Sequence, residues 1–354
     1  MMASSTLHDV EGDLFDRLPD PIVHSIFNKV QDAKTLCLSM SVCKRFYAIV
    51  PEVDAIFLSM KKENQQNPIK KNSKELKKSF KNVVGKVLAK PFKFLSQLLK
   101  LKSGSCHHGD DDYSYHRPDE VLKPFKDMRS LELVLPRSSG EIGSNLLRWK
   151  AEFGSQLQSC LFLGGTETMK INESSELCSC GDDSLARIGD EELKLRIVWT
   201  ISCLIAASTR HNLFQRTLME HQTLHNLIIR DESNQGTFRM NREQIKEFVK
   251  CMDHSGSGEV VDKETLMERT KLPPLRMKMW YVPELKLPAS GFVMKGATLA
   301  VMKPIKEGNK EVERGADWVV NAFDGEGEEE KVFGEAVRKL LKMKRSYTLE
   351  MNSF

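Results

Sequence analysis

The sequence predicts an α+β protein made of a small three-helix unit, a basic linker and a larger α/β domain. Between residues 18 and 50, apolar side chains recur at helical spacing, interrupted by prolines and capping residues. A lysine-rich stretch follows, and from residue 119 onward short apolar strands alternate with helical segments, as in α/β domains. These changes divide the 354 residues into a tail (1–12), a helical unit (13–58), a flexible basic linker (59–118) and an α/β domain (119–354).

The helical unit is predicted to begin at Leu18-Pro19-Asp20-Pro21, with Asp20 as the N-cap and Pro21 as the first helical residue. Asp32 is expected to cap a second helix, and either Ser39 or Ser41 a third one that ends before Pro51. The apolar face of the first helix consists of Ile22, Val23, Ile26, Phe27 and Val30.

Three short helices cannot bury this much apolar surface against one another, because small units leave too much of it in water. Leu38, for example, lies off the main apolar stripe of the second helix. The sequence therefore predicts that the surplus meets a partner.

The order and spacing of Leu18-Pro19, Ile26-Phe27, Asp32 with Leu36, and Val42-Cys43-Lys44-Arg45-Phe46 resemble the F-box. This resemblance implies docking on a Skp1-type adaptor, and through it on a cullin and a RING protein. The chain would then be a substrate receptor of an SCF ubiquitin ligase, acting in the nucleus and cytoplasm on a target protein that the sequence does not identify. The residues expected to contact the adaptor are Leu18, Pro19, Ile22, Ile26, Phe27, Leu36, Leu38, Val42, Cys43 and Phe46.

The net charge of +4 is unevenly placed, because residues 61–102 contain thirteen lysines and two acidic residues. Within this stretch, residues 74–102 form an amphipathic pattern interrupted by Pro91. Such a segment can pack its apolar face on a neighbouring domain, lie on an anionic membrane or bind calmodulin. The alternative function is therefore a membrane-surface or calmodulin-linked regulator, and no nucleic-acid partner is expected.

In the α/β domain, strands are predicted at residues 130–136, 159–163 and 226–230, each preceded by a helical stretch. The first two are 29 residues apart, an interval similar to that of leucine-rich repeats, but the next interval is much longer. We therefore expect an irregular, leucine-rich-repeat-like sheet. The uniformly apolar helix 191–209 should be buried across it, with Trp199 as a core residue.

The C-terminal part is predicted to complete the same sheet. Alternating apolar residues indicate strands at 275–282, 284–287 and 292–301. An acidic loop at 326–330 should precede a helix at 332–343 and a last strand at 346–351.

A narrower resemblance extends beyond the helical unit. The stretches Arg148–Gly154, Leu195–Ile201, Met279–Tyr281 and Leu349–Phe354 are similar to a plant F-box subfamily of the auxin-up-regulated type, which lacks kelch or regular leucine-rich repeats. The resemblance implies a common C-terminal fold and plant origin, but it assigns no substrate-binding residue.

No metal or cofactor is expected. The loop Asp253–Glu264 imitates a calcium loop but offers two carboxylates and has Val261 at the ninth position, so a polar capping loop is the preferred interpretation. Cys178 and Cys180 are half of a metal site without a second half. A further set in a flexible loop does not preorganise ligands: Cys106, His107, His108 and His116.

The sequence contains no phosphate-binding glycine loop, no G-x-S-x-G elbow and no HExxH helix, so an enzyme is not predicted. The first residues have neither a basic region nor an apolar run, which argues against a signal peptide. The eight cysteines are therefore expected as reduced thiols of an intracellular protein.

Overall fold

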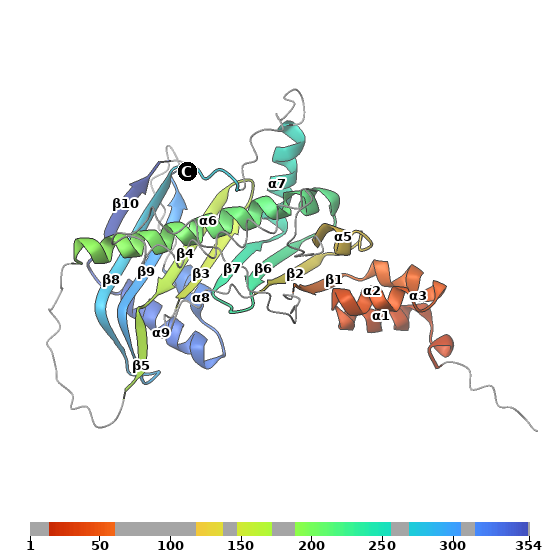
Figure 1. Ribbon diagram of the computed structural model, residues 1–354, viewed down its shortest axis with the longest axis horizontal. Coiled ribbons are helices and arrows are strands. Elements are labelled where there is room, and N and C mark those ends of the chain that lie inside the picture. Colours follow the sequence, from red (N-terminus) through yellow and green to blue (C-terminus); the bar gives the residue numbers. More distant parts are fainter. Residues whose placement is uncertain are drawn as a thin grey trace, which may run out of the picture.

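One mixed β-sheet links almost every part of the chain that the computed structural model describes, which comprises residues 14–60, 118–136, 147–171, 188–255, 269–305 and 316–352. The N-terminal helices lie at one end of the sheet, and strand β10 lies at the other (Figure 1). The predicted segment 74–102, the cysteine and histidine sets between residues 106 and 180, and most of the calcium-like loop lie outside the described residues.

The N-terminal unit consists of short helices followed by a strand. These elements are η1 (Leu14–Arg17), α1 (Asp20–Val30), α2 (Ala33–Met40), α3 (Lys44–Ile49), η2 (Val50–Glu52) and β1 (Ala55–Ser59).

The caps of these helices agree only in part with the sequence. Asp32 caps α2 as predicted, because its carboxylate accepts a hydrogen bond from the Thr35 backbone N–H at 2.9 Å. The other two caps were predicted wrongly. Pro19 is the N-cap of α1, which leaves the Asp20 carboxylate free to pair with Arg45 at 2.7 Å. Cys43 caps α3, since its Sγ faces the Phe46 N–H at 3.5 Å.

The remaining elements form the sheet domain. Its helices are α5 (Pro118–Leu122), α6 (Asp190–Glu220), α7 (Arg242–Ser255), α8 (Asp317–Phe323) and α9 (Glu328–Leu341). Its strands are β2 (Ser130–Leu135), β3 (Leu147–Phe153), β4 (Leu157–Gly164), β5 (Glu167–Lys170), β6 (Asn226–Asp231), β7 (Gly236–Met240), β8 (Leu275–Leu287), β9 (Phe292–Pro304) and β10 (Tyr347–Met351).

The sheet has the strand order β1-β2-β6-β7-β3-β4-β9-β8-β10, with β5 paired to β9. The pairs β1–β2, β2–β6 and β3–β7 are parallel, and the other pairs are antiparallel. The predicted combination of a helical unit with an α/β sheet is confirmed. Its repeat-like detail is wrong, because β6, β7 and β3 separate β2 from β4, so the 29-residue interval does not mark adjacent strands.

The strands at 130–136, 159–163 and 226–230 are confirmed, whereas the helix expected directly before β4 is strand β3. Leu147, Trp149, Ala151 and Phe153 of this strand alternate with more exposed residues, which places every second side chain in the core. The boundary predicted at residue 58 falls within β1, whose pairing with β2 joins the helical unit to the sheet.

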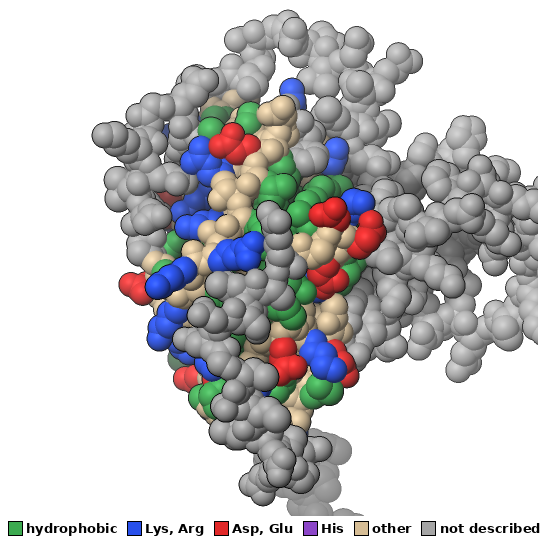
Figure 2. All heavy atoms as spheres, turned by 90° about the vertical axis from the view of Figure 1, so that its left-hand side faces the viewer, with side chains coloured by type: hydrophobic (Ala, Val, Ile, Leu, Met, Phe, Trp, Pro, Cys, Tyr) green, Lys and Arg blue, Asp and Glu red, His purple; other side chains and the backbone are tan. Residues whose placement is uncertain are grey.

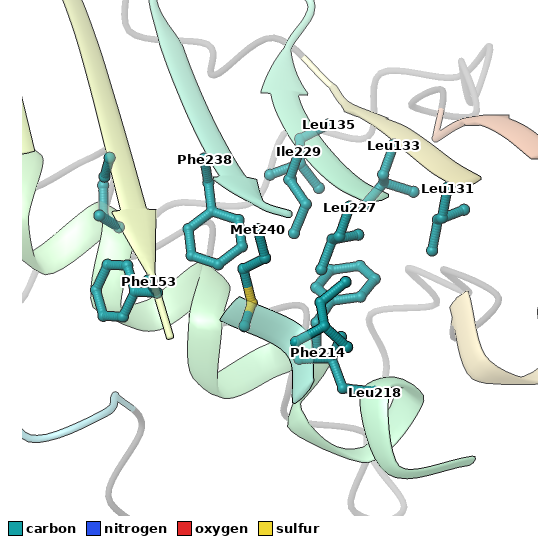
Figure 3. Close-up of a cluster of buried hydrophobic side chains, with 14 of the residues drawn as sticks. Leu131, Leu133, Leu135, Phe153, Phe214, Leu218, Leu227, Ile229, Phe238 and Met240 are labelled. Atoms are coloured by element: carbon teal, nitrogen blue, oxygen red, sulfur yellow. The ribbon is translucent and has the colours of Figure 1, made fainter. Parts of the chain in front are cut away.

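Helix α6 covers one face of the sheet and is longer than the predicted segment 191–209. Figure 3 shows side chains of β2, β6, β7 and β3 gathered around Phe214 and Leu218 of this helix. Trp199, predicted as a core residue, is half-buried: it packs against the same core from its margin, under the guanidinium of Arg196, whose central carbon is 4.5 Å from the ring centre.

Helices α8 and α9 cover the other face of the sheet over β4, β8 and β9, where they form a second apolar cluster. The predicted strands 275–282 and 284–287 are one strand, β8, which forms a long hairpin with β9. Glu328 to Glu330 form the first turn of α9 rather than a loop, a position where negative charge is favourable. The C-terminal part completes the sheet as predicted.

A buried histidine lies between α6 and the sheet. His211 stacks on Phe153 at 4.7 Å, its Nδ1 lies 2.7 Å from Thr270 Oγ1, and its Nε2 lies 3.1 Å from the carbonyl oxygen of Gly154. Burial lowers the pKa of His211 from 6.5 to about 4, so the imidazole is neutral in the folded chain at neutral pH.

This shift predicts a loss of stability in acid. Between about pH 6.5 and pH 4, His211 is protonated in the unfolded chain but not in the folded chain. The free energy of unfolding therefore falls as the pH falls. The pKa difference corresponds to about 3 kcal/mol once both values have been passed. Urea unfolding at several pH values should show a smaller acid loss for His211→Gln than for the wild type. His24→Gln, on α1 and outside the buried core, is the control that should keep the loss, and an equal loss in both variants would contradict the assignment.

Candidate functional site

Exposed apolar side chains are concentrated on the N-terminal helices. Among the described residues, nine large hydrophobic side chains are exposed, and six of them lie between residues 15 and 47. We call these six the N-terminal apolar surface: Phe15, Ile22, Ile26, Leu38, Val42 and Tyr47. Scattered single residues of this kind are normal on a protein surface, but a cluster on one small unit indicates an interaction site.

Helix α1 explains how the surface arises, because it carries two apolar stripes. Val23 and Phe27 are four residues apart and buried in the main core. Ile22 and Ile26 have the same spacing, one residue earlier, and are 49% and 37% exposed. The first stripe is used by the fold, and the second remains for another molecule.

The last turn of α2 and the turn that follows it present two strongly exposed members. Leu38 is 61% exposed and Val42 is 70% exposed. The turn is held by the Ser41 hydroxyl, which donates to the Leu38 carbonyl at 2.6 Å, and by the Val42 N–H, which donates to the Ser39 carbonyl at 3.1 Å. Side chains on such a braced turn keep their orientation, which lowers the entropic cost of binding.

Arg45 fixes the segment that precedes α1. Its guanidinium donates to the carbonyl oxygen of Phe15 at 2.7 Å, to Asp20 Oδ1 at 2.8 Å and to the carbonyl oxygen of Leu18. The ring of Phe46 packs edge-on against Phe15 at 5.6 Å between ring centres. A charge-assisted bond network of this kind holds η1 and Leu18-Pro19 against the helices.

The structure distributes the ten predicted contact residues over three environments. Pro19, Ile22, Ile26, Leu38, Val42 and Cys43 are exposed, and Leu18 and Phe46 are half-buried. Phe27 and Leu36 are 6% and 0% exposed, so we correct their role: they hold the core and cannot touch a partner unless the unit opens.

Sequence reasoning missed two members of the surface. Phe15 lies in η1, ahead of the first predicted helix, and Tyr47 lies on α3 beside the apolar stripe that the sequence suggests for this helix, Val42, Phe46, Ile49 and Val50. Both are large aromatic side chains that are exposed, at 40% and 64%. An aromatic residue beside, rather than on, the buried stripe was the available signal for Tyr47.

The described residues offer little other chemistry. No group of three metal-ligating side chains is present among them. No helix in the described part of the chain has the length and apolar character needed to cross a membrane. Burial raises the pKa of Cys160 to about 12, which keeps this core thiol protonated and unreactive.

Comparisons with known proteins agree with this geometry. The F-box-like family model matches residues 15–53, the stretch that carries the N-terminal apolar surface. The F-box protein At5g46170 of Arabidopsis thaliana is 38% identical, with 98% of this chain and 95% of that protein covered. The Arabidopsis F-box proteins AUF2 and AUF1 are 34% and 32% identical, with 97% of this chain and all of each relative covered. No solved structure matches the chain.

The N-terminal unit is thus an F-box, and F-box proteins generally act as non-catalytic substrate receptors of SCF ubiquitin ligases. The chain belongs to the plant F-box family that includes AUF1, AUF2 and At5g46170.

The division between buried and exposed apolar residues predicts different stability effects. Phe27→Ala and Leu36→Ala should each lower the free energy of unfolding by about 2–5 kcal/mol, because they leave cavities in the core. Leu38→Ala and Val42→Ala should change it by less than about 0.5 kcal/mol, because both side chains are already in water. Urea unfolding measures all four variants, and a large loss at Leu38 or Val42 would show that the chain itself covers these residues.

Proposed function

We propose that this protein is the substrate-receptor subunit of an SCF ubiquitin ligase, in which the F-box docks on a Skp1-type adaptor and the sheet domain recruits a target protein. The observation that carries the proposal is the N-terminal apolar surface, which lies within the F-box match. The contact set that we propose consists of Phe15, Leu18, Pro19, Ile22, Ile26, Leu38, Val42, Cys43, Phe46 and Tyr47.

The chemistry of this surface fits a protein partner. Complete burial of one exposed Leu, Ile or Phe side chain is worth about 1.5–3 kcal/mol before the costs of association are subtracted. Six such side chains on a braced frame can supply the apolar centre of an interface, where a few residues carry most of the binding energy. Because the side chains at the centre of this surface are uncharged, the matching surface of the partner need not carry charge.

The receptor would act by proximity rather than by chemistry of its own. Holding a target beside the ligase raises the effective concentration of its lysines near the charged ubiquitin carrier. Cullin and RING protein would be reached through the adaptor, and the nucleus and cytoplasm are the proposed places of action. The alternative function, membrane or calmodulin binding by residues 74–102, rests on residues outside the described part of the chain.

Capture of a purified Skp1-type adaptor by the full chain tests the proposal. Leu38→Asp with Val42→Asp places two carboxylates on the surface and should reduce capture by at least tenfold, because charges would have to be desolvated at the interface. A Leu18→Ala, Pro19→Ala double variant should also lose capture, because it removes two side chains of the proposed contact set, of which Pro19 is exposed and Leu18 half-buried.

Met252→Asp is the matched control, because Met252 is an exposed apolar residue on α7, outside the F-box. It should capture adaptor as the wild type does. Circular dichroism should show an unchanged fold for the Leu38 and Val42 double variant. If that variant keeps wild-type capture, the N-terminal apolar surface is not the adaptor site.

A further inference from the structure

Strand β10 forms an open edge at the end of the sheet opposite the F-box. It pairs with β8 on one side only, from Tyr347 opposite Met279 to Met351 opposite Leu275, and no other described strand pairs with it. An edge strand presents backbone N–H and C=O groups that an extended chain can use. Its Thr348 and Glu350 side chains are exposed.

The surface beside this edge is strongly positive. Five cations and one anion, Glu350, lie on the paired strand segments at this edge. These segments are β10, residues 275–279 of β8 and residues 300–304 of β9, and the count includes Lys344 and Arg345, which precede β10. We call this the β10 edge surface; its cations are Arg276, Lys278, Lys303, Lys344 and Arg345. Figure 2, which views this end of the molecule, shows Lys and Arg side chains gathered along its left side.

Three of the cations lie over aromatic rings. Lys278 Nζ is 5.2 Å from the centre of the Trp280 ring, Lys303 Nζ is 4.7 Å from that of Trp318, and the Arg345 guanidinium is 5.6 Å from that of Tyr347. Rings hold these side chains in place without neutralising their charge. Lys278 and Lys303 have no carboxylate partner among the described residues, so their charge is available to another molecule.

The open edge of β10 and the cations of β8 and β9 lie close together, because β8 pairs with β10 on one side and with β9 on the other. The register places Lys278 opposite Thr348, and Arg276 opposite Glu350, with which Arg276 forms an ion pair of 2.9 Å. A chain added along β10 would therefore carry one set of alternate side chains past Lys278, on the side of the sheet where α8 and α9 lie.

We propose that the β10 edge surface binds an extended acidic segment of the target protein, which adds to the sheet as a further strand. The edge backbone supplies the main-chain hydrogen bonds, and the cations select a strand with Asp or Glu at alternate positions. This inference rests on the proposed function, since it names the part of the sheet domain that holds the target. Eight strand-to-strand steps of about 4.8 Å separate β10 from β1, so the target would lie on the order of 40 Å from the F-box end.

Fluorescence anisotropy with the full chain tests the proposal without an adaptor. The probe is a labelled ten-residue peptide of alternating Glu and Val, and we expect it to bind at least tenfold more tightly than the same peptide with Lys in place of Glu. Methylation of the Val backbone nitrogens keeps the charge but removes hydrogen-bond donors, and should weaken binding severalfold. Affinity should also fall as salt rises, because the attraction is partly between exposed charges.

The K278E, K344E double variant should bind the Glu–Val peptide at least tenfold more weakly, because Lys278 lies on β8 beside β10 and Lys344 lies three residues before β10. R242E with K246E is the matched control, because it reverses two exposed cations on α7 and should bind as the wild type does. Both variants should capture adaptor as the wild type does. If the wild type binds the peptide but does not capture adaptor, the result counts against the proposed function and not against this surface.

The inference would be overturned by equal binding of the Glu–Val peptide to the K278E, K344E and wild-type chains, or by equal binding of methylated and unmethylated peptides. It would also be overturned if a ten-nucleotide DNA strand binds more tightly and displaces the peptide, or if light scattering shows a dimer that the peptide dissociates. The last two would assign the surface to a nucleic acid or to a second copy of this chain. Failure of the peptide to bind the wild type would also contradict the proposal.

Discussion

The F-box helices of this chain share one apolar core with the sheet, and this shared core governs the arrangement of the two parts. Val23, Phe27 and Leu36 belong to the same apolar cluster as Leu131 and Leu133 of β2. The connection is also made by the backbone. The Asp54 carbonyl accepts hydrogen bonds from the N–H groups of Arg129 and Ser130 at 2.7 and 2.9 Å, directly before β1 pairs with β2. Within the described residues, the F-box helices and the sheet therefore share one core and a backbone connection, and under the proposed function the target would have a defined direction from the ligase.

Two buried arginines give α6 a defined position on the sheet. Arg210 pairs with Asp231 at 3.2 Å, donates to the Gly236 carbonyl at 3.0 Å, and lies over the Trp149 ring. Nearer the start of the helix, Arg196 pairs with Glu192 and donates to Thr298 Oγ1 at 2.9 Å. Buried ion pairs contribute little net stability after desolvation, but breaking one leaves a costly unpaired charge. We therefore interpret these contacts as fixing the position of α6 along the sheet. The long apolar sequence of this helix alone would permit several positions.

The sequence predicted those strands in which both the spacing of the apolar residues and the length of the apolar run indicate a strand. Strands β2 and β6 alternate throughout and β8 alternates over its first residues, whereas β9 is a longer apolar run, and the positions of all four were found. Strand β3 was missed because Ala151, Glu152 and the following Gln residues favour helix by propensity. The alternation of Leu147, Trp149, Ala151 and Phe153 was the better guide. Strand order could not be predicted, because nothing in the sequence says that β6 and β7 insert between β2 and β3.

The candidate site shows the same limit on a smaller scale. The F-box spacing identified the helices, but it could not say which side chains face outward, because α1 is apolar on two adjacent stripes. The packing of the three helices on one another and on the shared core decides that Phe27 and Leu36 are internal while Ile22 and Leu38 are not. The same reasoning applies at β10, where a strand that looks like any other in the sequence is the last of the sheet. An open sheet has a first and a last strand, which here are β1 and β10. In this chain the F-box helices lie at the β1 end, and β10 is the opposite end of the strand order, where we propose that another polypeptide is added.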